Sequence, residues 1–406
     1  MKRHWVLTLL VSAALTGSVL AWNSVRQERE FRRLIAAGDL AVSRDQSSVA
    51  IEAFSGAVAL KPDSMLGYLK RGDTYRRRGE LAAALRDLRR AAALDPPAPK
   101  PKELLGDVNS ALGRFERAAE DYAAFLALDD RSPRVLYKLA LARYRHGQAA
   151  AALEPLRQAL AMDERFTEAH YLLGLCLRER RRDTDALRSL RQALAINPAF
   201  APARAELANL YSAQGRTREA IQQLEALAAL EPARAERLVD VGIAYARAGR
   251  VETAVLTLGR AAEQHPNEPA VYAALGRVWL DVAESKLDRV ALRKAIEALQ
   301  PLASRANASG ETLALYGRAL FLAGDAMQAE KVLTAAAARL PVDPRTFVYI
   351  AAAAQRLSRS EIYRAALARY VALTGSSAQL LSERVENAIE QQRSLRFAGS
   401  ASSPGR

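Results

Sequence analysis

A small residue recurs along this chain every 34 positions, and this recurrence constrains the fold more than any other feature. The series is Gly38, Gly72, Gly106, Ala140, Gly174, Ala208, Gly242 and Gly276. A period of that length indicates repeated helix-turn-helix units, each of which buries its apolar face only against its neighbours. A small residue in the first helix of a hairpin also allows the second helix to approach closely.

Other residue types repeat in the same phase. Alanines stand twelve positions after the small residues, at Ala50, Ala84, Ala118, Ala152, Ala186, Ala220 and Ala254. Prolines that would end the second helix often follow at the same distance again, at Pro62, Pro96, Pro198, Pro232 and Pro266. Glycines that suit the left-handed end of a first helix stand at Gly79, Gly113, Gly147, Gly215, Gly249 and Gly324. No run shows strict strand alternation, so the pattern predicts an all-α fold.

Two copies show the whole pattern. They are Tyr68, Gly72, Tyr75, Gly79, Ala84, Leu88 and Pro96, and then Leu238, Gly242, Tyr245, Gly249, Ala254, Leu258 and Pro266. This pattern resembles the tetratricopeptide repeat family. Ten copies cover residues 31–376, and the resemblance implies a right-handed α-solenoid of about ten helical hairpins with a C-terminal capping helix. A fold of this kind does not by itself name a ligand.

The repeats predict the domain limits. The solenoid should span residues 31–376, with a charged capping helix at 377–393 and a tail at 394–406, rich in Gly, Ser and Pro, that we expect to be disordered. The eighth copy is longer than the others, because Gly276 is followed by its alanine only at Ala295. The seven extra residues equal about two helical turns, so the hairpin can lengthen and keep its apolar face.

Residues 1–21 stand outside the repeats and have the order of a signal peptide. Lys2 and Arg3 precede an apolar run at 6–15, and small residues lead to a cleavage position after Ala21. Alternatively, residues 6–25 form an uncleaved membrane anchor with Trp22 at the interface. Residues 22–30 form the linker between the predicted signal peptide and the repeats.

Export is the expected localisation, with the repeats periplasmic or anchored in the inner membrane and facing the periplasm. The alternative is an anchored protein that faces the cytoplasm. It is favoured by the basic residues that follow the apolar run, because positive flanks tend to stay inside. These residues are Arg26, Arg29, Arg32 and Arg33.

The sequence contains no recognisable set of catalytic, cofactor-binding or metal-binding residues. Its four histidines lack partners at metal-ligand spacing, and no nucleotide-binding loop or nucleophile elbow occurs. The single cysteine, Cys176, lies in an apolar run and is interpreted as a core thiol. The net charge of +14 is interpreted as arginines spread over exposed helix faces, and attraction to anionic surfaces is the alternative. No nucleic-acid-binding motif accompanies the charge. We therefore expect neither an enzyme nor a nucleic-acid-binding protein.

The family resemblance implies that first helices line a concave face. Positions 2, 5, 9 and 12 of the fourth to sixth repeats then form a candidate groove for an extended peptide or a helix. Its residues are Arg134, Tyr137, Leu141, Tyr144, Tyr171, Leu175, Arg178 and Asn209. The alternative interpretation is that these tyrosines pack between neighbouring hairpins.

Together these features predict a non-enzymatic scaffold of the cell envelope. It would bind segments of other proteins on its concave face and support the assembly or secretion of a complex. One alternative is a polysaccharide-export or carbohydrate-binding accessory factor, in which Tyr137 and Tyr171 stack on sugar rings. A second alternative is a membrane-anchored adaptor that faces the cytoplasm. The sequence leaves the oligomeric state open.

Overall fold

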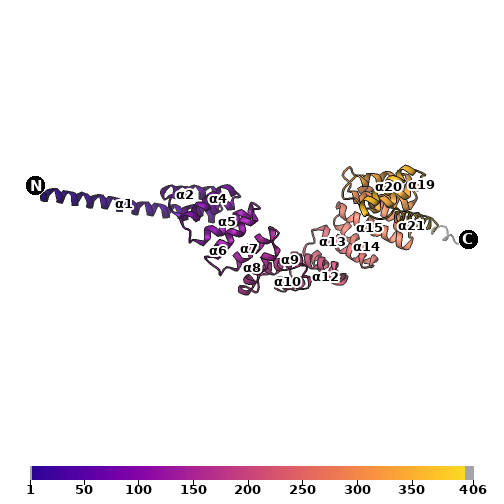
Figure 1. The fold of residues 1–406 in the computed structure, drawn as a ribbon, viewed down its shortest axis with the longest axis horizontal. Helices are drawn as coiled ribbons and strands as arrows, with labels where there is room; N and C mark the ends of the chain where they lie inside the picture. Colours follow the sequence, from indigo (N-terminus) through magenta and orange to yellow (C-terminus); the bar gives the residue numbers. More distant parts are fainter. Residues whose placement is uncertain (1, 398–406) are drawn as a thin grey trace. The chain divides into compact units, whose positions relative to one another are not determined.

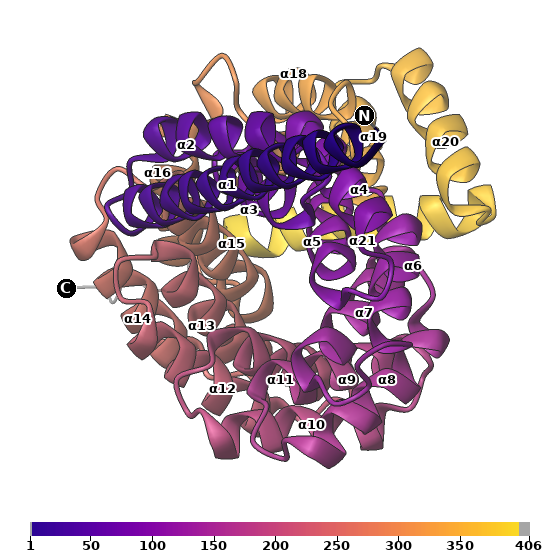
Figure 2. The ribbon, with the colours of Figure 1, turned by 90° about the vertical axis from the view of Figure 1, so that its left-hand side faces the viewer.

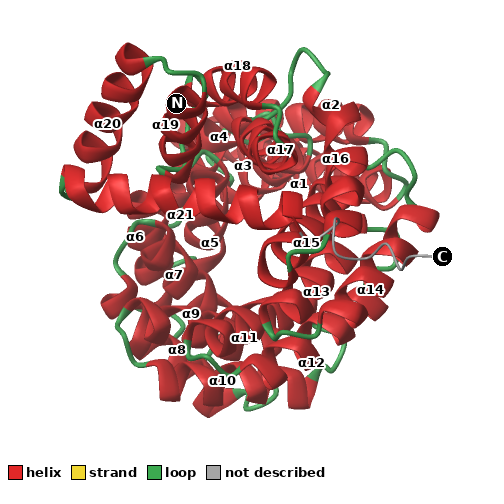
Figure 3. Cartoon of the chain, turned by 90° about the vertical axis from the view of Figure 1, so that its right-hand side faces the viewer, coloured by secondary structure: helices red, strands yellow, loops and turns green. Residues whose placement is uncertain are grey.

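The structure, a computed structural model, describes the backbone of residues 2–397 and the side chains of residues 22–396. In this part of the chain every regular element is a helix, 21 in all, and none is a strand (Figure 3). Helices α1 to α20 follow one another as ten hairpins, and α21 comes after the last of them. The predicted all-α repeat fold is confirmed.

The chain forms two compact units that meet at residues 203 and 204. Consecutive helices pair within the first unit, and Figure 2 shows α1 and α2 side by side as its first hairpin. The helices up to the boundary (Figure 1) are α1 (Lys2–Ser43), α2 (Ser47–Leu60), α3 (Met65–Arg77), α4 (Leu81–Leu94), α5 (Pro99–Ala111), α6 (Phe115–Leu126), α7 (Pro133–Arg145), α8 (Ala149–Met162), α9 (Thr167–Glu179), α10 (Asp183–Ile196) and α11 (Ala201–Ala213), which contains the boundary.

The second unit continues the same hairpin pattern. Its longest first helix is α15, as the insertion in the eighth repeat predicts. The helices are α12 (Thr217–Leu230), α13 (Ala235–Arg247), α14 (Val251–Gln264), α15 (Pro269–Lys286), α16 (Arg289–Ala303), α17 (Gly310–Ala323), α18 (Ala326–Ala337), α19 (Arg345–Arg356), α20 (Ser360–Thr374) and α21 (Ala378–Phe397).

The small residues hold the helices of each hairpin close together. A Cβ atom added to Gly242 would lie 2.6 Å from Leu258 Cγ, and one added to Gly276 would lie 2.4 Å from Leu299 Cγ. Both leucines come from the second helix of the same hairpin and are fully buried. The recurring small residue therefore makes room for a leucine that packs directly against the backbone of the first helix.

The turns within the hairpins repeat as regularly as the close contacts between their helices. At one position per hairpin the backbone is left-handed, usually at a glycine such as Gly147, with φ of 82°. Four hairpins instead place a side chain there, at Asp45, Arg181, Leu287 and Ser358. The second helices end two residues before their prolines, as α2 does before Pro62. The structure therefore confirms the helix ends that the glycines and prolines predict.

Helix α21 lies across the first helices α17 and α19 as well as against α20 (Figure 3). Its apolar side, which includes Leu381, Val385 and Leu395, is buried. The buried Gln392 side chain donates to the Phe321 carbonyl at 2.8 Å, near the C-terminal end of α17. The capping helix thus covers more than the final hairpin.

The N-terminal prediction falls mostly outside what the structure describes. The backbone of α1 is helical from Lys2 onward, but the side chains of the predicted signal peptide or anchor at residues 1–21 are outside the described part. No helix among the described residues is long and apolar enough to span a membrane. At the other end, α21 includes residues 394–397 of the predicted tail, and residues 398–406 lie outside the description.

Candidate binding surfaces

The structure brings most of the predicted groove residues into one apolar cluster in the first unit. Tyr137, Leu141 and Tyr144 come from α7, and Tyr171 and Leu175 come from α9. Leu175 belongs to the buried core of the cluster, and the other four side chains are partly buried around it. We call these five side chains the α7–α9 surface. They lie together as predicted, but much of their apolar area is already packed within the protein.

Two of its tyrosines contact the neighbouring hairpin. The Tyr137 ring lies 5.1 Å from the ring of Phe166, which precedes α9. The Tyr171 ring lies 5.4 Å from that of Phe200, in an edge-to-face arrangement. Aromatic pairs of this geometry stabilise packing beyond the area they bury. These contacts support the alternative interpretation, in which the tyrosines join adjacent repeats.

The remaining predicted residues differ in their surroundings. Arg134 is exposed at the start of α7, and Arg178 is half-buried near the end of α9, where it has interaction partners. Asn209 is exposed on α11 and belongs to the second unit. Arg134 and Asn209 therefore offer polar groups to solvent, whereas Arg178 is already engaged.

Two ionisable groups of this cluster stay neutral near pH 7. Burial, together with a hydrogen bond to Glu179, raises the pKa of Tyr144 to about 12. Burial also raises the pKa of the Cys176 thiol to about 12. Since a thiolate is the reactive form, Cys176 is a packed core side chain, as its apolar sequence context indicates.

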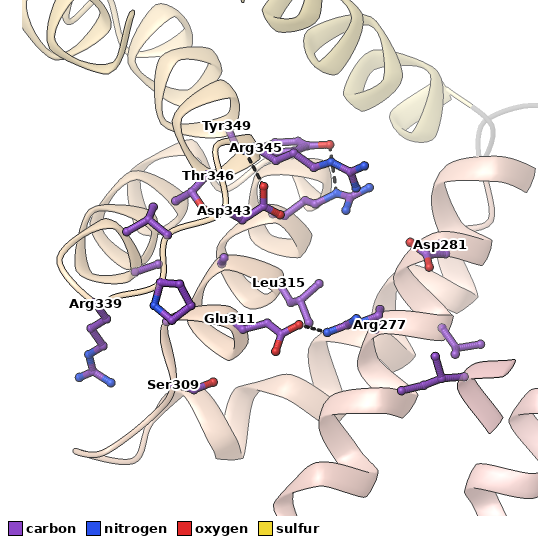
Figure 4. Close-up of a pocket in the computed structure, with 18 of the residues that line it drawn as sticks. Arg277, Asp281, Ser309, Glu311, Leu315, Arg339, Asp343, Arg345, Thr346 and Tyr349 are labelled. Carbon is purple, nitrogen blue, oxygen red and sulfur yellow. Dashed lines mark hydrogen bonds and ion pairs between the residues drawn. The ribbon is translucent and has the colours of Figure 1, made fainter. Parts of the chain in front are cut away.

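A second surface, absent from the predicted site, lies in the second unit. It is a cavity of about 1140 Å³ lined by the first helices α13, α15, α17 and α19 and by the loop between α18 and α19 (Figure 4). Its charged lining consists of Arg247, Arg277, Asp281, Glu311, Arg318, Arg339, Asp343 and Arg345, and its apolar lining includes Ile243, Val278, Leu315 and Val342. We call this space the arginine cavity.

A buried network holds one side of the arginine cavity. Arg318 Nε donates to the Tyr349 hydroxyl at 3.1 Å, and the same guanidinium pairs with Glu284. The side chains of Arg318 and Glu284 are only 16% and 13% exposed. Burial acts to lower the pKa of Arg318, but Tyr349 and Glu284 outweigh it and raise that pKa, so the guanidinium stays charged.

Most other charged groups of the cavity lining are also engaged. Arg277 forms an ion pair with Glu311, and Arg339 donates to the Ala306 carbonyl at 3.2 Å. Asp343 accepts a hydrogen bond from the Arg345 backbone N–H at 2.8 Å, at the beginning of α19. Figure 4 shows the Arg277–Glu311 pair on one side of the cavity and Arg345 and Tyr349 on another. The lining is thus an ordered set of side chains with a surplus of arginine.

A smaller hollow of about 220 Å³ adjoins the arginine cavity and shares Arg318, Arg345 and Tyr349 with it. Helix α21 supplies its other wall through Arg384, Asn387, Ala388 and Gln391. Helix α21 therefore borders this space on one side.

The sequence did contain a signal for the arginine cavity. Positions 2, 5, 9 and 12 of the seventh to tenth repeats include Ile243, Arg277, Glu311, Arg318 and Arg345, all of which line it. In the fourth to sixth repeats the same positions include the residues of the predicted groove. The position rule therefore predicts part of the cavity lining, but it predicts neither Arg247 nor the pairing of the charges.

Comparisons with known proteins agree with the fold. One tetratricopeptide repeat model matches residues 35–99, 104–164 and 137–201, and a second matches residues 184–239 and 213–278. No curated protein matches the chain.

Solved structures with a similar fold include a tetratricopeptide repeat protein from Parabacteroides merdae. It is 20% identical, with 62% of this chain and 99% of that chain covered and a TM-score of 0.47. PilF of Pseudomonas aeruginosa is 22% identical, with 51% and 94% covered and a TM-score of 0.42. PilW, described as a type IV pilus biogenesis factor, is 18% identical, with 50% and 94% covered and a TM-score of 0.43.

The two repeat models together match more than half of the residues, in phase with the hairpins that the structure contains. Proteins built from these repeats are typically non-catalytic scaffolds that bind other proteins. On this evidence the chain belongs to the tetratricopeptide repeat family.

Proposed function

We propose that this protein is a non-enzymatic scaffold of the cell envelope that binds segments of partner proteins along the first helices of its repeats. The observation that carries the proposal is the arginine cavity, which extends over four consecutive first helices. Its volume of about 1140 Å³ exceeds the roughly 300–1000 Å³ of ordinary small-molecule pockets. A stretch of polypeptide suits such a space better than a compact metabolite does.

The α7–α9 surface contributes less to this proposal. Tyr137 and Tyr171 already pack on Phe166 and Phe200, so their rings are partly occupied within the protein. The exposed Arg134 lies at the edge of that surface and would contact only the rim of a bound segment. We therefore place the main partner contact in the second unit.

The envelope location rests on the N-terminal sequence. Residues 1–21 would direct export, either as a cleaved signal or as part of an anchor at residues 6–25. On the described part of α1, Trp22 is 69% exposed, and Arg26, Arg29 and Arg33 are also exposed. An aromatic residue followed by cations supports contact with the headgroup region of an anionic membrane.

Photocrosslinking in the host cell tests the scaffold. A photoreactive amino acid at Leu315, in the arginine cavity, should yield one or a few discrete products with other proteins. The control position is Met327, which is exposed on α18 and does not line the cavity. Equal products from both positions, or none from Leu315, would contradict the proposal.

The location is tested separately by N-terminal sequencing and by protease treatment of spheroplasts. A mature chain that starts at Trp22, or an intact anchored chain whose repeats are digested from outside, agrees with export. Protection of the repeats until the membrane is broken would instead establish an adaptor that faces the cytoplasm.

A further inference from the structure

We propose that the arginine cavity selects an acidic segment of its partner, bound in extended conformation, with carboxylates directed at Arg247 and Arg345. This inference rests on the proposed scaffold function and adds the chemistry of the partner. It follows from the charges of the lining, from which of those charges are already paired, and from the distribution of apolar side chains among them.

The lining has a positive surplus that the protein itself does not neutralise. The lining has five arginines and three acidic residues, and Glu284, which lies outside the lining, pairs with Arg318. Glu311 is engaged by Arg277, and Asp343 accepts a backbone hydrogen bond at the start of α19. Among residues 22–396, neither the Arg247 nor the Arg345 guanidinium has a hydrogen-bond or ion-pair partner. These two cations therefore remain available for a ligand.

The two available arginines come from the outermost of the four first helices. Arg247 is at the end of α13, and Arg345 begins α19. Between them, on α17, the charged Arg318 is held by Glu284 and Tyr349. The adjoining hollow has no acidic residue in its described lining and adds Arg384 beside Arg345. Cations thus recur along the whole length of the surface.

Apolar side chains share the cavity lining with the cations. Leu315 on α17 and Val342 in the loop before α19 line the cavity, as do Ile243 on α13 and Val278 on α15. Carboxylates bound by guanidinium groups form strong, directional hydrogen bonds, while aliphatic side chains would bury against this apolar strip. The best occupant therefore alternates acidic and aliphatic residues.

The length of the surface sets the length of the segment. Packed helices lie about 8–10 Å apart, so four adjacent first helices span roughly 25–30 Å. An extended chain advances about 3.3 Å per residue, so about eight or nine residues cover that distance. A ten-residue peptide is a suitable probe.

A peptide fits these charges better than a nucleic acid does. Asp281, Glu311 and Asp343 are interspersed among the arginines and would repel a phosphate at each nucleotide. A peptide can place neutral residues opposite these carboxylates and acidic ones opposite the arginines. The pattern of both signs therefore favours a polypeptide with spaced carboxylates.

Fluorescence anisotropy with the full chain tests this inference. The probe is a labelled ten-residue peptide in which Glu alternates with Leu and Ser, and its reference is the same peptide with every Glu replaced by Gln. We expect the Glu peptide to bind at least about tenfold more tightly, because each charge-assisted contact is roughly twice as strong as a neutral one. The difference should shrink as salt is raised.

A pair of matched variants locates the binding. The double variant Arg247→Gln and Arg345→Gln removes the two available cations and should weaken binding of the Glu peptide about tenfold or more. Because neither guanidinium forms a hydrogen bond or an ion pair, the melting temperature of the double variant should change little. The control variant Arg364→Gln and Arg369→Gln removes the same charge from exposed positions on α20, outside the cavity, and should leave affinity unchanged.

The possible results separate this inference from the proposed function. Equal binding of the Glu and Gln peptides would overturn charge selection and leave the scaffold proposal standing. Equal losses in the two double variants, or equally tight binding of a ten-nucleotide single strand, would show unspecific attraction and overturn it. If no probe binds, the inference fails, while crosslinking at Leu315 still decides the scaffold function.

Discussion

Glycines in the helices of this protein have opposite physical effects, although they look alike in the sequence. Gly276 lies at a helix crossing, where a Cβ would meet Leu299 Cγ at 2.4 Å. Gly259 lies inside α14, where a Cβ would meet nothing within 4 Å. Packing requires a glycine at position 276. At position 259 no packing contact requires glycine, and its low helix propensity destabilises α14.

Replacing these two glycines by alanine should therefore change the free energy of unfolding in opposite directions. Gly259→Ala should raise the free energy of unfolding by about 0.5–1 kcal/mol, because alanine favours a helix over glycine. Gly276→Ala should lower it by about 1–3 kcal/mol, since Leu299 must move away from the new Cβ. Urea unfolding measures both changes. Stabilisation by both variants would show that the crossing is looser than the structure indicates.

Arg181 shows how far a single residue can depart from the repeat pattern. It has φ of 59° at the turn where most hairpins have glycine. A left-handed conformation costs a non-glycine residue about 1–2 kcal/mol, so the fifth hairpin keeps its turn against a local preference. The packing of α9 on α10 around Leu190 and Ala186, both buried, offsets that cost.

At the level of helices, consecutive first helices are joined by side chains as well as by packing. Lys138 on α7 contacts Glu103 and Asp107 on α5, each at 2.8 Å, and Lys100 also pairs with Glu103. Burial works to raise the pKa of Glu103, but the hydrogen bonds from Lys100 and Lys138 outweigh it and lower the pKa from 4.5. The ionised carboxylate therefore stabilises the stacking of α5 on α7.

This lowered pKa predicts a dependence of stability on pH. A carboxyl whose pKa is lower in the folded state contributes stability above its unfolded pKa and loses it as pH falls through the folded value. At pH 7, Glu103→Gln should lower the free energy of unfolding by about 1–2 kcal/mol. The difference from the parent chain should close as pH falls below 4.5. A difference that stays constant from pH 7 to pH 3 would contradict this account.

Helix α21 stabilises the second unit by covering helix ends. Gln391 donates to the Glu284 carbonyl at 3.2 Å, and Gln392 donates to the Phe321 carbonyl at 2.8 Å. Arg396 donates to the Gly324 carbonyl at 3.2 Å. Carbonyls at the end of a helix lack partners within it, and a cation there is favourable. The capping helix thus binds the C-terminal ends of α15 and α17 in addition to covering apolar surface.

For the whole molecule, each hairpin contacts chiefly its neighbours. A destabilising substitution should therefore loosen only the hairpins near it. Leu299→Ala removes a fully buried side chain of α16 and should cost about 2–5 kcal/mol. Hydrogen exchange should accelerate in α15 to α18 and stay unchanged in α3 to α8.

The control for this experiment is Leu256→Ala, because Leu256 is exposed on α14. It should leave exchange unchanged throughout the chain. Faster exchange in α3 to α8 after Leu299→Ala would show that the chain unfolds as a single cooperative unit.

The sequence by itself determined the repeat family, the hairpin phase and the helix ends. These follow from short-range rules: Gly276 permits a close crossing, Gly147 adopts a left-handed turn, and Pro62 cannot continue a helix. Each rule acts within one or two hairpins. A periodic sequence therefore contains the same signal once in nearly every repeat.

Only the tertiary structure decided which side chains are occupied and which remain available. Tyr137 and Tyr171 are partly used by Phe166 and Phe200, and Arg318 is held by Glu284 and Tyr349, whereas Arg247 and Arg345 remain available in the described part of the chain. These pairings join residues roughly 30 or more positions apart, and they depend on how one hairpin stacks on the next. A binding surface consists of the polar and apolar groups that remain without partners after the hairpins have stacked. Residue type and spacing alone therefore do not determine it.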